Sequence, residues 1–158
     1  MLNPFKGVFD SYIISCASGM QNLTNLIRSI NSLEKLFQRV NDVDFMAQQD
    51  EVVRLGLQAG LIQNLEFTYE LCWKNIKRWI EQNLQPNEAD GVTRRELYRI
   101  AAENKLIDDV NLWMDFHQAR HETSHRYDAV LAVEVMQIIG AFIIATKNLQ
   151  TKLQMHND

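Results

Sequence analysis

An arginine and a histidine stand five positions apart in the C-terminal half of the chain, and a tyrosine follows them. Arg120, His125 and Tyr127 form the pattern Arg-x4-His-x-Tyr. A histidine exchanges a proton near neutral pH, so it acts as general base or general acid. An arginine holds a phosphate and stabilises the negative charge that develops on it. The pair therefore fits cleavage of RNA by its own 2′-hydroxyl, a group that DNA lacks.

The neighbours of this pair allow supporting roles and also plainer interpretations. Ser124 and Tyr127 are the nearest side chains that could orient the imidazole of His125. Alternatively, His125 is a solvated residue near a helix end and Tyr127 packs beside the next helix. For Arg120 the alternative is an intramolecular ion pair, because an arginine near a core needs an anionic partner. Its candidate partners are Glu66, Glu70 and Asp115.

The segment around Arg120 has the period of an amphipathic helix. Trp113, Phe116 and Arg120 follow at spacings of three and four residues, which places them on one side of the helix. His125 lies about 140° around the axis from Arg120, at about 100° per residue. The two side chains meet if the helix ends near His125, or if two subunits pair and place both motifs in one cleft. The second arrangement predicts a homodimer with its site at the interface.

A metal site is the competing interpretation of the same segment. His117, His121 and His125 are four residues apart, so one helical face carries three imidazoles, and two at this spacing are a common zinc pair. The third lies about 6 Å further along the axis, and no cysteine or carboxylate is clearly placed to complete the ligand set. We therefore expect no physiological metal and no other cofactor.

Composition places this segment in a helical protein. The 158 residues suffice for one domain with a sizeable core. Only 6 Gly and 2 Pro are present, which disfavours an all-β fold with its many tight turns. The net charge of −4 argues against a broad basic face for duplex nucleic acid but allows a local basic cleft. Three arginines cluster along one segment, at Arg94, Arg95 and Arg99.

The cysteines and the lengths of the apolar runs indicate the cellular compartment in which the protein is expected. Cys16 and Cys72 form neither a disulfide framework nor a metal-ligand spacing, which is typical of a reduced, cytosolic protein. The longest apolar runs are far shorter than a membrane span, and the N-terminus makes a poor signal peptide. We expect a cytoplasmic protein that does not enter a membrane.

Apolar residues at spacings of three and four predict five helices, over residues 21–40, 49–83, 94–104, 109–126 and 129–153. The expected fold is all-α, an up-and-down bundle of four main helices with one short extra helix. Thr93 and Glu96 fit a capping box at the start of the short helix. The segment 107–109, Ile-Asp-Asp, can cap the helix that follows it, and Asp128 is placed to cap the last helix.

The helix predicted over 49–83 is apolar on more than one side. Val53 belongs to its main stripe, and Phe67 widens that stripe. Such a helix should lie centrally or face a partner as well as its own core. Gly56 and Gly60 weaken its first part and mark either a bend or a close contact with another helix.

Three segments follow from these patterns. Residues 1–19 show no sustained helical period and form an N-terminal extension, which is either an upstream addition that is not native or an ordered arm. Residues 20–153 form the helical bundle. Residues 154–158 form a tail that should fray.

Two blocks of sequence resemble the HEPN superfamily, and specifically the HepT-like proteins, also called nucleotidyltransferase substrate-binding proteins. The first block is Leu-Glu-Phe-Thr-Tyr-Glu-Leu-Cys-Trp-Lys at 65–74. The second comprises Leu-Ile-Asp-Asp at 106–109, Leu-Trp-Met-Asp at 112–115 and the Arg-x4-His-x-Tyr pattern at 120–127. The likeness runs in order through residues 20–153, so it is far more specific than the short motif alone.

This resemblance implies a dimerising four-helix bundle whose partner is a minimal nucleotidyltransferase encoded nearby. In related pairs the HEPN protein is an RNase toxin, and the arginine and histidine of the motif, here Arg120 and His125, are catalytic. The nucleotidyltransferase acts as antitoxin, and in some pairs it adenylylates the motif tyrosine, here Tyr127.

One residue departs from the family pattern. His121 follows the motif arginine, where the family usually has Asn or Asp, so it either takes over a supporting polar role or alters activity. The branch nearest to this sequence was first described as a substrate-binding subunit. A non-catalytic substrate-binding subunit of a two-component nucleotidyltransferase is therefore the alternative function.

Overall fold

The regular elements of the protein are helices throughout the part of the chain that the structure describes. The computed structural model describes the backbone of residues 6–84, 87–123 and 133–155, and the side chains of 22–84, 87–122 and 135–155. The helices are α1 (Lys6–Asn41), α2 (Val43–Ala47), α3 (Glu51–Asn83), α4 (Arg94–Glu103), α5 (Val110–Thr123) and α6 (Val133–Met155). The prediction of an all-α fold is confirmed.

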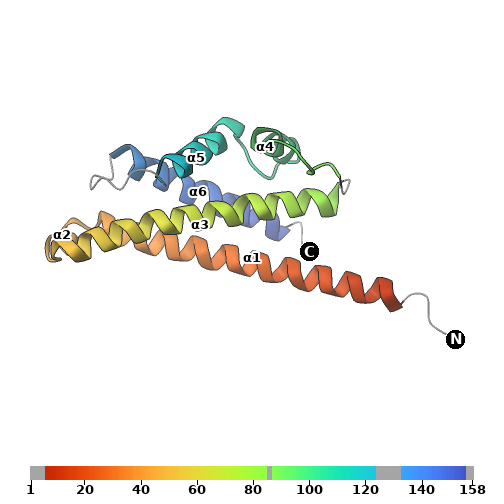
Figure 1. The fold of residues 1–158 in the computed structure, drawn as a ribbon, viewed down its shortest axis with the longest axis horizontal. Coiled ribbons are helices and arrows are strands. Elements are labelled where there is room, and N and C mark those ends of the chain that lie inside the picture. Colours follow the sequence, from red (N-terminus) through yellow and green to blue (C-terminus); the bar gives the residue numbers. More distant parts are fainter. Residues whose placement is uncertain (1–5, 85–86, 124–132, 156–158) are drawn as a thin grey trace.

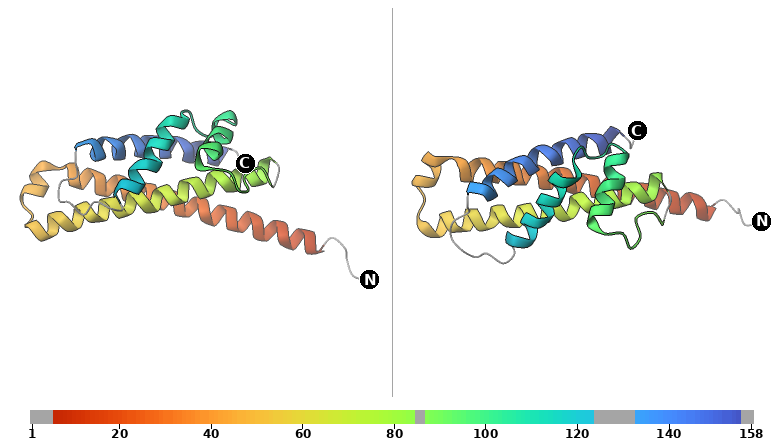
Figure 2. Two further views of the ribbon diagram at one scale, coloured as in Figure 1. Left: turned by 45° about the horizontal axis from the view of Figure 1, so that its top comes forward. Right: turned by 90° about the horizontal axis from the view of Figure 1, so that it is seen from above.

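The four long helices form the bundle, and α4 is the short extra helix. Figure 1 shows α1 and α3 lying side by side along the long axis of the molecule. Helix α6 packs against both, and α5 packs across α3 and α6, as the two views of Figure 2 show. Helix α4 contacts α5 and α3. The bundle thus holds α5, which carries Arg120, against the middle of α3.

Side-chain caps set several helix starts. Asp50 accepts a hydrogen bond from the Val53 amide at 2.8 Å and begins α3. Thr93 accepts one from the Glu96 amide at 3.2 Å and begins α4, as the capping-box pattern predicts. Asp109 accepts from two amides at the start of α5, at 2.8 and 3.2 Å. The predicted cap at Asp128 lies outside the described residues.

The core is built where the apolar stripes of the helices converge. From α1 it takes Leu26, Ile30 and Leu33, all fully buried. Three aromatic rings fill the space between α5 and α6: Trp113 and Phe116 lie 5.7 Å apart, and each meets Phe142, at 6.2 and 5.0 Å between centroids. Their edge-to-face packing adds about 0.5–1.5 kcal/mol per pair beyond the buried area. These rings fix the rotation of α5 and therefore the direction in which Arg120 leaves it.

Helix boundaries differ from the prediction at both ends and at one turn. Helix α1 begins at Lys6 rather than at residue 21, because a helix can form without the sustained apolar stripe from which its start was predicted. The polar break at 41–44 contains a helix start, since Asp42 caps the short α2. Helix α6 continues to Met155, so Gln154 and Met155 are helical rather than a frayed tail. The division of the chain at residues 19 and 153 stays a prediction.

The first turns of α3 leave apolar side chains in the open. Val53, on the predicted main stripe, is 41% exposed. Further along α3, Phe67 is also 59% exposed, although Leu61 and Leu65 before it are buried. The buried part of α3 begins only at Leu61, because α3 starts beyond the reach of α4 and α5. Close contact with α1 occurs at Gly60, where a Cβ atom would lie 3.4 Å from the Leu36 side chain, while Gly56 faces open space.

The structure also bears on a cysteine and on the question of membrane spans. Cys72 is a free, fully buried thiol, and burial raises its pKa well above the ordinary value. In the described ranges no helix combines the length and the apolar character that crossing a bilayer requires.

Candidate functional site

Arg120 reaches from α5 toward α3 and pairs with a carboxylate there. Its Nη2 atom lies 3.2 Å from Oε1 of Glu70, and the two side chains are 31% and 32% exposed. The aromatic residues one and two turns earlier on the same side of α5, Phe116 and Trp113, are buried. The stem of Arg120 thus starts from the core side of α5 and its guanidinium ends at the edge of the bundle. Of the three predicted ion-pair partners, the structure shows Glu70.

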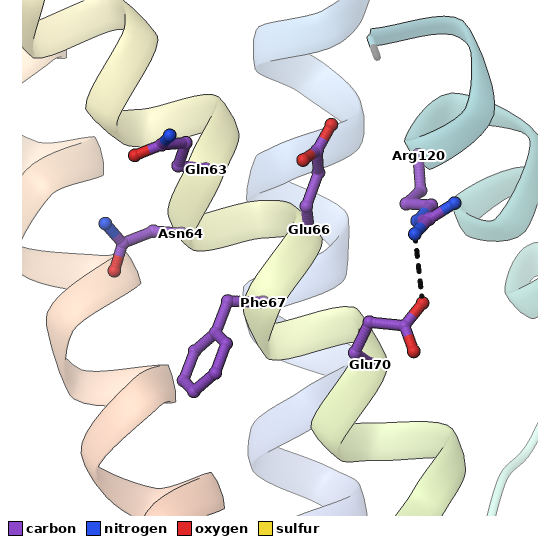
Figure 3. Close-up of a pocket in the computed structure, with 6 residues that line it drawn as sticks. All are labelled: Gln63, Asn64, Glu66, Phe67, Glu70 and Arg120. Carbon is purple, nitrogen blue, oxygen red and sulfur yellow. Dashed lines mark ion pairs between the residues drawn. The ribbon is translucent and has the colours of Figure 1, made fainter.

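A hollow of about 520 Å³ opens beside this ion pair. Figure 3 shows Arg120 pointing from α5 toward Glu70, with the other lining side chains arrayed along α3. The lining consists of Gln63, Asn64, Glu66, Phe67, Glu70 and Arg120. Two carboxylates thus line a hollow with one guanidinium, so a phosphate that approaches Arg120 competes with Glu70.

Glu70 is held by more than Arg120. Its Oε2 atom accepts a hydrogen bond from Nε1 of Trp73 at 2.9 Å, and the Lys74 ammonium lies 4.0 Å away. A carboxylate that accepts from two directions is fixed in its rotamer. Glu70 therefore orients the guanidinium of Arg120 and the indole of Trp73 together.

A hydrogen-bonded chain of three side chains lies beneath the ion pair. The Tyr69 hydroxyl lies 2.6 Å from that of Tyr98 and 2.7 Å from Nδ1 of His117. Burial raises the pKa of Tyr69 to about 12 and raises that of Tyr98 further, so both phenols keep their protons. If Tyr98 donates to Tyr69 and Tyr69 donates to His117, neutral His117 carries its proton on Nε2.

His117 is kept neutral by its surroundings. Burial is the largest cause of its lowered pKa, followed by the nearby charges of His121, Arg94 and Arg120, against which Glu70 acts more weakly. The ring of His121 stands edge-on to it, with 4.8 Å between centroids, and His121 itself is exposed. Nδ1 of His117 is engaged with Tyr69, and the described residues hold no group of three ligands suited to a metal ion.

Three predicted site residues have no described position. Ser124, His125 and Tyr127 lie outside the described residues, and the described part of α5 ends at Thr123. The structure therefore brings Arg120, Glu70 and, around them, His117 and His121 together. The meeting of Arg120 with His125, within one subunit or between two, stays a prediction.

The structure adds residues that sequence reasoning did not place in the site. The Arg94 guanidinium lies over the Trp73 ring, 3.6 Å from its centroid, and Tyr69 and Tyr98 form the buried hydrogen bonds. Tyr69 and Trp73 belong to the block at 65–74 that carries the resemblance, and Arg94 belongs to the arginine cluster. Those two signals marked the residues, but spacing along one helix does not tell which side chains of α4 meet α3.

Comparisons with known proteins agree with this architecture. A family model described as nucleotidyltransferase substrate binding protein like matches residues 21–155. A Haemophilus influenzae protein named "Probable ribonuclease HepT" is 31% identical over 137 residues, 86% of this chain and 94% of that protein. A solved Haemophilus influenzae structure, described as the fold of a substrate binding domain of a nucleotidyltransferase, matches with a TM-score of 0.77 and 32% identity. That match covers 84% of this chain and 98% of the other.

Proposed function

Because the chain belongs to the nucleotidyltransferase substrate binding protein-like, or HepT-like, family, we propose that it is a HEPN-type ribonuclease toxin held in check by a small nucleotidyltransferase. The observation that carries this proposal is the position of Arg120. Its side chain is about one-third exposed at the wall of a hollow large enough for a nucleotide, and Glu70 fixes the direction of its guanidinium. A relative named as a ribonuclease supports the same chemistry.

In the proposed reaction the 2′-oxygen of RNA attacks the adjacent phosphorus, and the bond from phosphorus to the 5′-oxygen breaks. The products are a 2′,3′-cyclic phosphate and a 5′-hydroxyl. His125 takes the proton of the 2′-hydroxyl or delivers one to the leaving 5′-oxygen. Arg120 stabilises the charge on the phosphoryl oxygens, and Ser124 and His121 support the imidazole and the phosphate. The reaction requires no metal.

The site is completed by a second copy of the chain. Arg120 and His125 lie about 140° apart around a helix, so two subunits that face each other bring both side chains to one phosphate. Phe67 is 59% exposed in the wall of the Arg120 hollow, and its burial would favour such a contact. Val52, Val53 and Leu55 extend the exposed apolar surface along α3.

Control by the partner acts on Tyr127. Its phenolic oxygen attacks the α-phosphorus of ATP in the active site of the nucleotidyltransferase, a bond to AMP forms, and pyrophosphate leaves while the phenolic proton passes to a base. The added phosphate places negative charge two residues from His125, where it repels the RNA backbone. RNA and this partner place the system in the cytoplasm, in line with its cysteine usage.

Expression of the chain alone, with Arg120→Ala and His125→Ala beside it, tests the ribonuclease. The wild type should arrest growth and, purified, cleave single-stranded RNA in the presence of EDTA, and both variants should not. Arg99→Ala is the matched control, because Arg99 is exposed and pairs with Glu96 on its own helix. Equal toxicity of the wild type and the two motif variants would rule the proposal out.

The substrate-binding subunit is the second candidate function, and the hollow itself favours it. Glu66 and Glu70 face the space that a phosphate must enter, and Glu70 already engages Arg120. Co-purification with the nucleotidyltransferase separates the two functions. A stable complex without RNA cleavage by either form, and without AMP on Tyr127 in mass spectrometry, would establish the subunit and exclude the toxin.

A further inference from the structure

A second hollow lies on the other side of Trp73, about 350 Å³ in volume. It is formed between the C-terminal half of α3, the segment that leads into α4, and α5. The lining consists of Trp73, Lys77, Ala89, Gly91, Val92, Arg94, Leu97 and His117. None of the residues that line the Arg120 hollow lines this one.

Arg94 is the principal charge in this hollow. Its guanidinium stacks on the indole of Trp73 at 3.6 Å, and Glu70 holds that indole through Nε1. A stacked guanidinium keeps its N–H edge directed outward in the plane of the stack. Across the described ranges, no carboxylate forms an ion pair with Arg94.

The other polar groups of the hollow do not neutralise Arg94. Lys77 is held by Glu81 at 3.3 Å and by Asp90 at 3.5 Å, so its charge is already matched. His117 is directed to Tyr69 through Nδ1, which leaves its Nε2 as a neutral donor when Tyr69 supplies the proton. Among the described residues, the hollow thus combines one oriented guanidinium that forms no ion pair with a further N–H donor, the groups that recognise a phosphate.

We propose that the Arg94 hollow binds a phosphate of the RNA strand whose scissile phosphate lies at Arg120. This inference rests on the proposed function and adds a second subsite to it. Two helices each contribute residues to both hollows. On α3, Trp73 lies one turn after Glu70, and on α5, His117 lies one turn before Arg120. In this proposal, a strand held at Arg120 must extend past these two turns to Arg94.

The dimensions and charge favour a single strand over a duplex. A hollow of about 350 Å³ encloses one phosphate with its sugar, while duplex binding needs cations spread over a broad face, which a net charge of −4 does not provide. The strand is held at discrete points instead. Arg94 is one of them.

Binding of a labelled single-stranded RNA oligonucleotide to the full-length dimer tests this subsite. The protein carries His125→Ala so that the strand stays intact. Adding Arg94→Ala should weaken binding about tenfold and lower the slope of log K against log salt by about 0.7, the value for one phosphate contact on a single strand. Arg95→Ala is the matched control, because Arg95 is exposed and bonds Asn111 instead; it should change affinity less than about twofold.

A second variant covers the case in which Arg94→Ala unfolds. Arg94→Gln keeps a planar group over Trp73 and removes the charge, so it should show the same loss of affinity and of salt slope. Equal binding by the Arg94 variants and Arg95→Ala overturns the subsite, and so does a dimer that binds no oligonucleotide. Arg94-dependent binding of AMP with strand binding unchanged would assign the hollow to a mononucleotide and overturn the RNA assignment.

The failure of this inference differs from the failure of the proposed function. If the wild type cleaves RNA and Arg94→Ala binds the strand normally, the ribonuclease holds and the subsite is wrong. If Arg94→Ala loses affinity but the wild type never cleaves RNA, the subsite holds and catalysis at Arg120 is wrong.

Discussion

The two hollows on either side of Trp73 each present an arginine, yet the two arginines are in opposite electrostatic situations. Arg120 lies beside Glu70 at 3.2 Å in a hollow with two carboxylates. Arg94 lies on an aromatic ring, and the acidic residues near its hollow pair with Lys77. The arginine in the recognisable motif is therefore the one whose charge is already matched. Arg120 offers a guanidinium held in a fixed direction by Glu70, whereas Arg94 offers a guanidinium that forms no ion pair among the described residues.

This contrast predicts different kinetic losses at the two positions. Arg120→Ala should lower kcat for RNA cleavage by about 10²- to 10³-fold, because its contact strengthens as charge develops on the phosphate. Arg94→Ala should raise KM about tenfold and change kcat little, because a remote phosphate binds equally in the ground and transition states. Steady-state kinetics on one RNA substrate measure both. A loss of kcat at Arg94 would end the distinction between the two hollows.

The buried hydrogen bonds of Tyr69 to Tyr98 and to His117 should matter for stability. Tyr69→Phe removes the hydroxyl that serves both Tyr98 and His117 and should lower the free energy of unfolding by about 1–3 kcal/mol. Tyr98→Phe removes only the terminal hydroxyl of these hydrogen-bonded side chains, so it should lower the free energy of unfolding by less. Urea denaturation of both variants compares them. An equal cost would show that the bond to His117 contributes nothing.

Glu70→Gln should make the two arginines more alike. The amide keeps an acceptor for Trp73 but releases Arg120 from a charged partner, so RNA affinity of the His125→Ala protein should rise a few-fold. Because the pair is about one-third exposed, stability should fall by less than about 1 kcal/mol. Glu122→Gln removes the same charge from the end of α5, where Glu122 bonds only Gln118 among the described contacts. The same rise in affinity for both variants would assign the effect to net charge.

The smallest expected effect is a pH dependence at His117. Its pKa in the folded protein lies below the ordinary value of histidine, so the unfolded chain binds the proton first and stability falls as the pH drops below about 6.5. His117→Gln should flatten this part of the curve of unfolding midpoint against pH. An unchanged curve would assign the dependence to other groups. The groups around His117 are Tyr69 and Glu70 on α3, Arg94 on α4, and Arg120 and His121 on α5.

Sequence patterns predicted the bundle because helix periods and caps are local. Thr93 and Asp109 cap α4 and α5 at the positions their residue types indicate. The early start of α1 at Lys6 was missed, because an apolar stripe reports the core a helix covers and not the length of the helix. Val53 belongs to the predicted apolar stripe and is 41% exposed, because a stripe cannot tell a core face from an exposed face.

The site was predicted less completely, because its contacts join distant segments. The Arg120–Glu70 pair was one of three alternatives, and it depends on the rotation of α5, which Trp113 and Phe116 set. The bonds from Tyr69 to Tyr98 and to His117 span 29 and 48 residues, and no periodicity contains that information. His125 and Tyr127 stay predictions from the motif.

The shared carboxylate of Glu70 couples the two arginines thermodynamically. One oxygen faces Arg120, the other accepts from Trp73, and Trp73 supports the guanidinium of Arg94. Any ligand that draws Glu70 out of this arrangement at one end changes the affinity at the other end. The coupling factor must be the same in both directions, since reciprocity holds for all binding equilibria. If a molecule bound at Arg94 changes the affinity at Arg120, a molecule bound at Arg120 must change the affinity at Arg94 by the same factor.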